Sequence, residues 1–312
     1  MADTARGSTR TRRKTDRAPM SDSPGRVVQG NMIGLTMSDI DVWSDRVVTV
    51  LGQNPGPFTG PGTNTYLVGT SARPLLLDTG DGTPAYMPLL IQALDEHRDS
   101  RELQGIVATH AHPDHIGGIA NVREHFGDLV TSKRPWKGMD GPIDGPVVAI
   151  DGEAVIETEG ATLRAIFTPG HACDHLCYWL EEERAIFTGD VVLGAGTTVI
   201  PEHGGDLFDY MESLQRLLEL EPEVLYPAHG PVIRNAGEKI RQYIAHRNLR
   251  EEQILEVLGE GVSAVPDMVR IIYADVPEFL WPAAGTSVRS HLGKLLRENR
   301  VIRTGDDWSL VS

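Results

Sequence analysis

Residues 105–115 read Gly-Ile-Val-Ala-Thr-His-Ala-His-Pro-Asp-His, an aliphatic run followed at once by three histidines and an aspartate. The run from Gly105 to Thr109 has the length and composition of a buried strand. The polar residues from His110 to His115 therefore begin where that strand ends, and a loop there can direct several side chains to one place. Imidazole and carboxylate are the nitrogen and oxygen ligands that zinc prefers in proteins. The stretch predicts a metal site at one edge of a sheet.

Three further strand-like runs each lead to a polar residue of the same kind. Residues 163–168 precede His171, residues 185–188 precede Asp190, and residues 224–226 precede His229. A rigid sheet presents a site through residues at the ends of its strands. We therefore expect these three side chains to join the histidine cluster.

The remaining pattern divides the chain into three parts. Residues 1–25 are rich in Ser, Thr, Arg and Pro without apolar periodicity, which predicts a disordered tail. Residues 26–236 alternate short β-branched or aliphatic runs with helix-like runs, which predicts a large catalytic domain. Residues 237–312 carry three helix-like runs and then a strand pair around Gly305-Asp306-Asp307, the order of a winged-helix domain.

The motifs around these candidates resemble those of the metallo-β-lactamase superfamily. They are Thr109 to His115, Thr168-Pro169-Gly170-His171, Thr188-Gly189-Asp190 and Pro227-Ala228-His229-Gly230. The resemblance implies an α+β fold, a four-layer αββα sandwich, followed here by the small winged-helix domain. It implies that His110, His112 and His171 hold one metal, that Asp114, His115 and His229 hold a second, and that Asp190 bridges them. Asp78 matches the superfamily's aspartate that braces the cluster loop.

Other segments resemble the β-lactamase-like-protein-2 branch of this superfamily. They are residues 54–59, 62–68, 193–198, 230–233 and 240–255. The likeness covers roughly residues 40–312 and includes the winged-helix tail. Residues 200–205 form a loop longer than is usual in the branch, so we expect the rim that faces the substrate to differ from that of the branch.

The implied site suits metal-assisted hydrolysis. Two zinc ions per chain would lower the pKa of water to about 7, and we predict a metal-bridging hydroxide as the nucleophile. Asp114 and Asp190 are the predicted catalytic residues that position it, and Asp114 also carries a proton to the leaving group. Members of the branch include an endoribonuclease acting on single-stranded RNA and thioesterases that release polyketides from carrier proteins. The predicted substrate is therefore a small acyl ester or thioester, or single-stranded RNA.

Two alternatives from other classes stay open. A mononuclear iron persulfide oxygenase uses the same scaffold, but it would leave part of the second metal set unused. A non-catalytic nucleic-acid-binding winged-helix protein would have a degenerate metal site, whereas all seven ligand positions are filled here. The formal net charge of −15 disfavours a long polyanion.

Composition also bears on membrane contact, cellular location and disulfide formation. No stretch approaches the roughly 20 apolar residues of a membrane helix, so we expect no membrane contact and a cytoplasmic protein. Organelle targeting by the basic tail is a weaker alternative. Cys173 and Cys177 lie in a segment with strand character, where four steps span about 13 Å, too far for a mutual disulfide. A thiol metal site with His175 is less favoured than two small side chains on one strand face.

Overall fold

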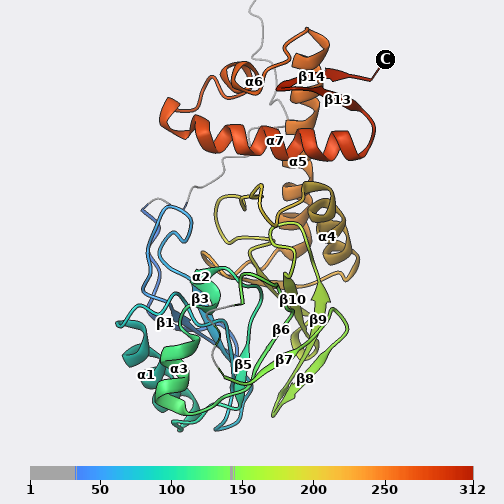
Figure 1. Ribbon diagram of the computed structural model, residues 1–312. Coiled ribbons are helices and arrows are strands. Elements are labelled where there is room, and N and C mark those ends of the chain that lie inside the picture. Colours follow the sequence, from blue (N-terminus) through green and yellow to red (C-terminus); the bar gives the residue numbers. More distant parts are fainter. Residues whose placement is uncertain (1–31, 33, 141–142, 144, 312) are drawn as a thin grey trace, which may run out of the picture.

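We analysed a computed structural model, which describes residues 32, 34–140, 143 and 145–311 of the chain. The tail predicted to be disordered, residues 1–25, lies outside the described residues. Figure 1 shows a body of two sheets with helices outside them, and a smaller helical unit beyond one end of that body.

The first sheet has seven strands that follow one another in chain order. They are β1 (Ile40–Val42), β2 (Val47–Leu51), β3 (Asn64–Val68), β4 (Leu75–Leu77), β5 (Gly105–Val107), β6 (Thr131–Lys133) and β7 (Val147–Ala149). Strands β1 to β4 pair antiparallel, and β4 to β7 pair parallel. The change of direction at β4 places β5, the strand before the histidine cluster, near the middle of the sheet.

The second sheet has five strands in the order β12-β11-β10-β9-β8. They are β8 (Val155–Thr158), β9 (Ala161–Phe167), β10 (Leu176–Leu180), β11 (Ala185–Gly189) and β12 (Val224–Pro227). Only β11 and β12 pair parallel. These two strands therefore end at the same edge, and they deliver Asp190 and His229 to it.

Side-chain alternation along the strands produces the layers. Leu75 and Leu77 pack into the core between the two sheets, whereas Leu76 faces the outer side of the first sheet. Helices α1 (Tyr86–Arg98) and α3 (Ile119–Phe126) cover that outer side. Helices α4 (Leu207–Glu219) and α5 (Ala236–Gly259) cover the second sheet. The predicted αββα sandwich is confirmed.

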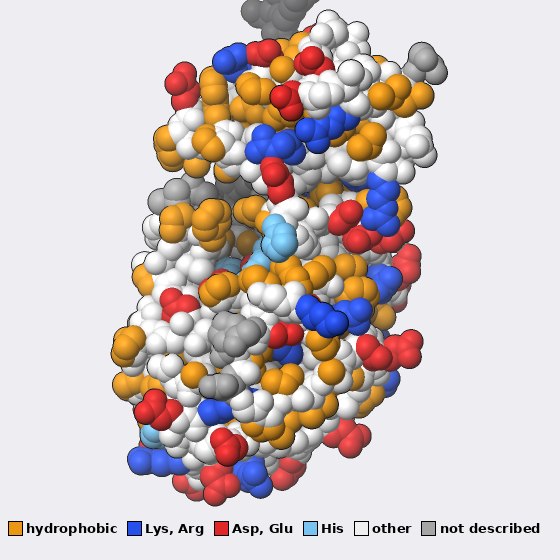
Figure 2. Space-filling view, viewed as in Figure 1, with side chains coloured by type: hydrophobic (Ala, Val, Ile, Leu, Met, Phe, Trp, Pro, Cys, Tyr) orange, Lys and Arg blue, Asp and Glu red, His pale blue; other side chains and the backbone are white. Residues whose placement is uncertain are grey.

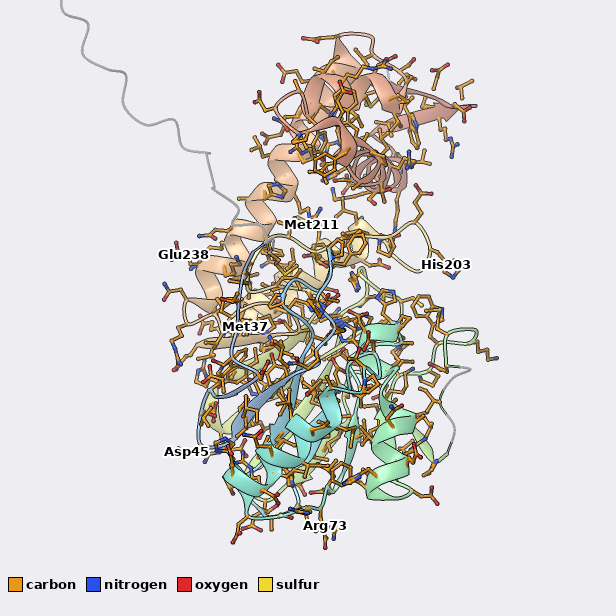
Figure 3. The ribbon with its side chains drawn as sticks, turned by 90° about the vertical axis from the view of Figure 1, so that its left-hand side faces the viewer. Met37, Asp45, Arg73, His203, Met211 and Glu238 are labelled. Atoms are coloured by element: carbon orange, nitrogen blue, oxygen red, sulfur yellow. The ribbon has the colours of Figure 1, made fainter. Side chains whose placement is uncertain are left out.

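The C-terminal unit contains α6 (Val265–Ile272), α7 (Trp281–Arg297), β13 (Val301–Thr304) and β14 (Asp307–Leu310). Its core also takes Ile254 and Leu258 from α5, whereas Ile240 and Tyr243 of the same helix pack in the body. Figure 3 shows α5 rising from Glu238 on the body to the C-terminal unit. The predicted boundary at residues 236–237 stays a prediction, because this 24-residue helix serves both cores.

One expectation about the cysteines is wrong. Strand β10 begins at Leu176, so Cys173 lies in the loop before it, exposed, while Cys177 is buried on the strand. The loop forms because residues 169–175 turn to bring His171 to the site. Both cysteines are free, as predicted.

Among the described residues, none of the helices is both long and apolar enough to cross a bilayer.

Gly170 permits the close approach of the His171 loop to α4. Its φ is +132°, and a Cβ built there would lie 2.3 Å from the Cα of Tyr210. We expect Gly170→Ala to lower the free energy of unfolding by about 1–3 kcal/mol, because the loop and helix must move apart. Chemical denaturation measures this. Gly127→Ala is the matched control, since Gly127 also has a positive φ (+90°) but no neighbour within 4 Å of the built Cβ; an equal loss in both variants would contradict the steric argument.

Candidate metal centre

All seven residues predicted as ligands lie together at one edge of the sandwich. His112 precedes α2 (Pro113–Ile116), a single helical turn that carries Asp114 and His115. Three groups of three described residues could each hold a metal ion. Two of them share no residue: His110, His112 and His171 form one, and Asp114, His115 and His229 form the other. The third, His110, His115 and Asp190, overlaps both. Within each group the ligand atoms lie within 4.8 Å of one another.

Asp190 lies between the two groups and turns one carboxylate oxygen towards each. Its Oδ2 is 3.4 Å from Nε2 of His171, in the first group. Its Oδ1 is 3.2 Å from Nε2 of His229 and 3.6 Å from Nε2 of His115, in the second group. Asp190 follows β11 directly, so its position depends on the rigid second sheet.

Asp78, fully buried after β4, holds the cluster loop from behind. Its carboxylate accepts hydrogen bonds from the backbone N–H of Thr109 (2.8 Å) and from the Thr109 hydroxyl (2.9 Å). Its Oδ2 also lies 2.8 Å from Nδ1 of His115. A carboxylate on one ring nitrogen keeps the proton there and leaves Nε2 free to act as a ligand.

The histidines of the two groups differ in charge. Burial and the neighbouring imidazoles lower the pKa of His110 well below its usual range and that of His112 to about 4. Burial also lowers the pKa of His171. Burial opposes protonation of His229 as well, but Asp190 and Asp114 outweigh it and raise its pKa to about 9. The first group is therefore neutral at pH 7, which is the form that binds metals.

The donor set fits a cation, on two observations. Nε2 of His115 and Oδ1 of Asp190 are both buried and make no hydrogen bond to any described residue, although they face each other at 3.6 Å. Two unpartnered donor atoms at that separation suit a shared ion better than a direct contact. In addition, burial opposes protonation of His115, but the Asp114, Asp78 and Asp190 carboxylates outweigh it and raise its pKa, so a proton supplies the positive charge that a metal would bring.

Two positioning residues were not predicted from the sequence. His175 is buried, and its Nε2 accepts a hydrogen bond from the backbone N–H of Asp190 (3.1 Å). Asn64 donates to the carbonyls of Pro227 and Gly230 (both 2.8 Å), on either side of His229. His175 was considered only as part of a thiol site, and among the described residues neither cysteine belongs to a group that could hold a metal.

A cavity of about 370 Å³ opens above the cluster, with His112, Asp114, His171, Asp190 and His229 on its floor. Its walls are mainly apolar and include Met32, Pro57, Phe58, Leu193, Val199 and Pro201. The Phe58 side chain is 71% exposed at the rim. The long loop at residues 200–205 also reaches this rim, because the His203 ring stacks on Trp136 at 5.9 Å, and Trp136 lies 6.0 Å from the His112 ring. His203 projects from the outer side of that loop (Figure 3).

Comparison with known proteins agrees with this geometry. The model of the metallo-beta-lactamase superfamily matches residues 58–229, which include all seven candidates, and that of the beta-lactamase associated winged helix domain matches residues 264–308. A beta-lactamase-like protein 2 homolog from Caenorhabditis elegans is 42% identical over 267 residues, covering 84% of this chain and 88% of that one. An atrochrysone carboxyl ACP thioesterase from Aspergillus fumigatus is 42% identical over 253 residues, covering 77% and 78%.

A solved structure supports the fold over nearly the whole chain. A beta-lactamase domain protein from Burkholderia ambifaria superposes with a TM-score of 0.74 at 19% identity, covering 91% of this chain and 97% of that one. The sandwich and the winged helix thus match two family models in the same chain, and the His/Asp cluster lies within the residues matched by the first. The chain belongs to the metallo-beta-lactamase superfamily, in the branch that carries a C-terminal winged helix, and it is a metal-dependent hydrolase.

Proposed function

We propose that this protein hydrolyses the thioester or ester of a small acyl substrate with two zinc ions held by the seven-residue cluster. The observation that carries the proposal is the position of Asp190, with one carboxylate oxygen turned to each of two separate ligand groups. His110, His112 and His171 would hold one ion. Asp114, His115 and His229 would hold the other, and Asp190 would bridge them.

The residues around the two proposed zinc ions would have different roles in hydrolysis. When bound, the two ions would lower the pKa of a coordinated water to about 7 and polarise the scissile carbonyl. Asp190 would orient the attacking oxygen between the two groups. Asp114 lines the cavity and has the more exposed side chain of the two acids, so its carboxylate would accept the water's proton and pass it to the leaving group. Asp78 and His175 would hold His115 and Asp190 in place.

The cavity walls favour an acyl substrate over RNA. Apolar side chains suit a hydrocarbon or aromatic acyl group, whereas RNA needs accessible positive charge along its backbone. Most basic side chains of the winged helix are already paired with carboxylates. They are Arg270, Arg289, Lys294, Arg297, Arg300 and Arg303. The similarity to the Aspergillus fumigatus thioesterase supports the same choice.

A substrate panel tests the proposal. An acyl-N-acetylcysteamine thioester, a lactone, single-stranded RNA and a cephalosporin are each incubated with zinc-loaded protein. We expect the thioester to be turned over fastest and its hydrolysis to disappear in His110→Ala, which removes a ligand. His125→Ala is the matched control, because His125 is an exposed histidine of α3 that belongs to none of the candidate ligand groups.

Three results would contradict the proposal. Cleavage of RNA without thioester turnover would assign the endoribonuclease activity. One iron per chain with oxygen uptake on a persulfide would assign the oxygenase. Nucleic-acid binding that survives removal of metal, without turnover of any substrate, would assign a binding protein.

A further inference from the structure

A second cavity, of about 440 Å³, lies where α5, α7 and the loop at residues 197–200 meet. Polar and basic side chains on its walls include His246, Arg247 and Arg250 from α5 and Thr286, Ser287 and Ser290 from α7. Figure 2 shows the molecule narrowing at the level between the body and the winged helix. The cavity is therefore built by both units and belongs to neither alone.

Two arginines line its wall, one of them buried and the other half-buried. Arg247 is 6% exposed, and its Nη2 donates to the carbonyl of Thr198 (2.7 Å). Arg250 donates from Nη1 to Gln253 (2.8 Å), and its guanidinium lies over the Tyr273 ring at 4.0 Å. The Nε of each arginine is buried without a hydrogen-bond partner among the described residues. Both groups retain donor capacity for a further partner.

Neither guanidinium has a counter-ion in the described part of the chain, where no carboxylate lies within 4.0 Å of either. The adjacent acid in the sequence, Glu251, is engaged by Lys294 and Arg300 (both 2.7 Å). A buried charge without a counter-ion is costly, so such charges are normally paired or bind a ligand. The positive potential acts on a neighbour: burial and the two arginines lower the pKa of His246 to about 4.

This second cavity adjoins the one above the metal centre. Phe58, Thr197, Thr198 and Val199 line both. The Val199 carbonyl accepts a hydrogen bond from Nδ1 of His171 (2.7 Å), and the preceding carbonyl is the one that binds Arg247. One short segment thus separates a candidate ligand from the arginine cavity, and a substrate can extend along it from one to the other.

We propose that the cavity of Arg247 and Arg250 is an anion-binding subsite, which holds a carboxylate or phosphate of the substrate while its acyl bond lies at the metal centre. The proposal rests on the proposed function and narrows it to acyl substrates that carry an anionic group. Arg250 would provide the main contact, because Arg247 also supports the Thr198 carbonyl.

Binding is tested first, without turnover. Isothermal titration calorimetry measures the affinity for inorganic phosphate and for glutarate. It is performed on the full-length metal-loaded protein, on Arg250→Gln and on Arg241→Gln. We expect Arg250→Gln to weaken binding of at least one probe by about tenfold or more. Arg241→Gln should bind as the unmodified protein does, since Arg241 is an exposed arginine of the same helix outside the cavity. Equal affinity in all three would overturn the subsite, and phosphate bound at the metals would appear in all three alike.

Ser287→Asp is a second variant, which tests the subsite even if Arg250→Gln fails to fold. Ser287 lines the same cavity, so an aspartate there would supply the missing counter-ion. We expect this variant to lose the same binding without a lower Tm. Retained binding in Ser287→Asp would contradict the proposal.

Three thioesters test which part of the substrate, the acyl group or the leaving group, carries the anionic group. They are a neutral acyl-N-acetylcysteamine, its succinyl analogue with a carboxylate on the acyl group, and an acyl pantetheine 4′-phosphate with the charge on the leaving group. We expect one charged substrate to have a KM about tenfold below the neutral one, and Arg250→Gln to remove that preference. Equal KM values for all three would reject the subsite while leaving thioester hydrolysis intact. Binding that depends on Arg250 without hydrolysis of any thioester would reject the proposed function instead.

Discussion

Asp190→Ala is expected to remove bound metal and to lower kcat/KM by at least about 1,000-fold, since loss of an outer supporting partner alone typically costs about 10- to 100-fold. Asp190 faces both ligand groups, so its loss affects both ions at once. It also removes a negative charge that would otherwise stabilise two adjacent cations. No other single side chain of the cluster reaches both groups with separate oxygens.

Metal content after dialysis and turnover of the thioester are the two measurements. Metal analysis is independent of the substrate, so it remains informative if the thioester is the wrong choice. Asp128→Ala is the control, because Asp128 is an exposed acid in the loop after α3. Two ions per chain and full activity in Asp190→Ala would rule out the bridging role.

Asp78→Ala is expected to lower the free energy of unfolding by about 3–5 kcal/mol, the range found when one partner of a buried pair is removed. The change would leave the Thr109 N–H, the Thr109 hydroxyl and the His115 ring without their acceptor. Asp78 also has a φ of 58°, a left-handed conformation that alanine adopts less readily than aspartate. Urea denaturation of metal-loaded and metal-free protein measures the loss. A similar loss in both forms would show that Asp78 braces the loop before any metal binds.

Asp78→Asn separates bracing from ligand orientation. The amide retains one acceptor for Thr109 but presents N–H groups to Nδ1 of His115, which disfavours the ring tautomer that leaves Nε2 free. We expect a smaller loss of stability than in Asp78→Ala, with metal affinity lower by about 10- to 100-fold. Asp81→Asn, at an exposed position of the same segment, should leave metal affinity unchanged. Unchanged affinity in Asp78→Asn would show that Asp78 does not orient His115.

Local sequence accounts for most of the body. The runs at residues 47–51, 65–68 and 75–77 are short, β-branched or aliphatic and bounded by turn residues, a pattern that predicts strands, and all three are strands in the structure. The short strands β6 to β8 were not predicted. Two of them, β7 and β8, begin with β-branched pairs (Val147-Val148 and Val155-Ile156), but they have only three and four residues and are partly or wholly exposed, so the local signal is weak. Pairing with a neighbour, which is a tertiary contact, makes them strands.

The candidate ligands could be predicted because their signal is local. His110, His112, Asp114 and His115 lie within six positions, and the other three follow strands that end at one edge. The positioning residues carry no such signal. His175 binds the backbone of Asp190, 15 residues later in the chain, and Asn64 binds the carbonyl of Pro227, 163 residues later. Nothing in the sequence near either residue reveals its partner.

The sequence by itself therefore predicted the order of the two units and the residues of the candidate metal cluster, because periodicity and strand ends are short-range properties. Its resemblance to a known superfamily implied the fold class. The tertiary structure decided how the two oxygens of Asp190 are shared between ligand groups. It also decided that α5 joins two cores, and that Arg247 and Arg250, beside the cavity above the metal cluster, have no counter-ion among the described residues. Burial and the absence of a nearby carboxylate depend on the approach of segments far apart in the chain, and only the folded structure specifies that approach.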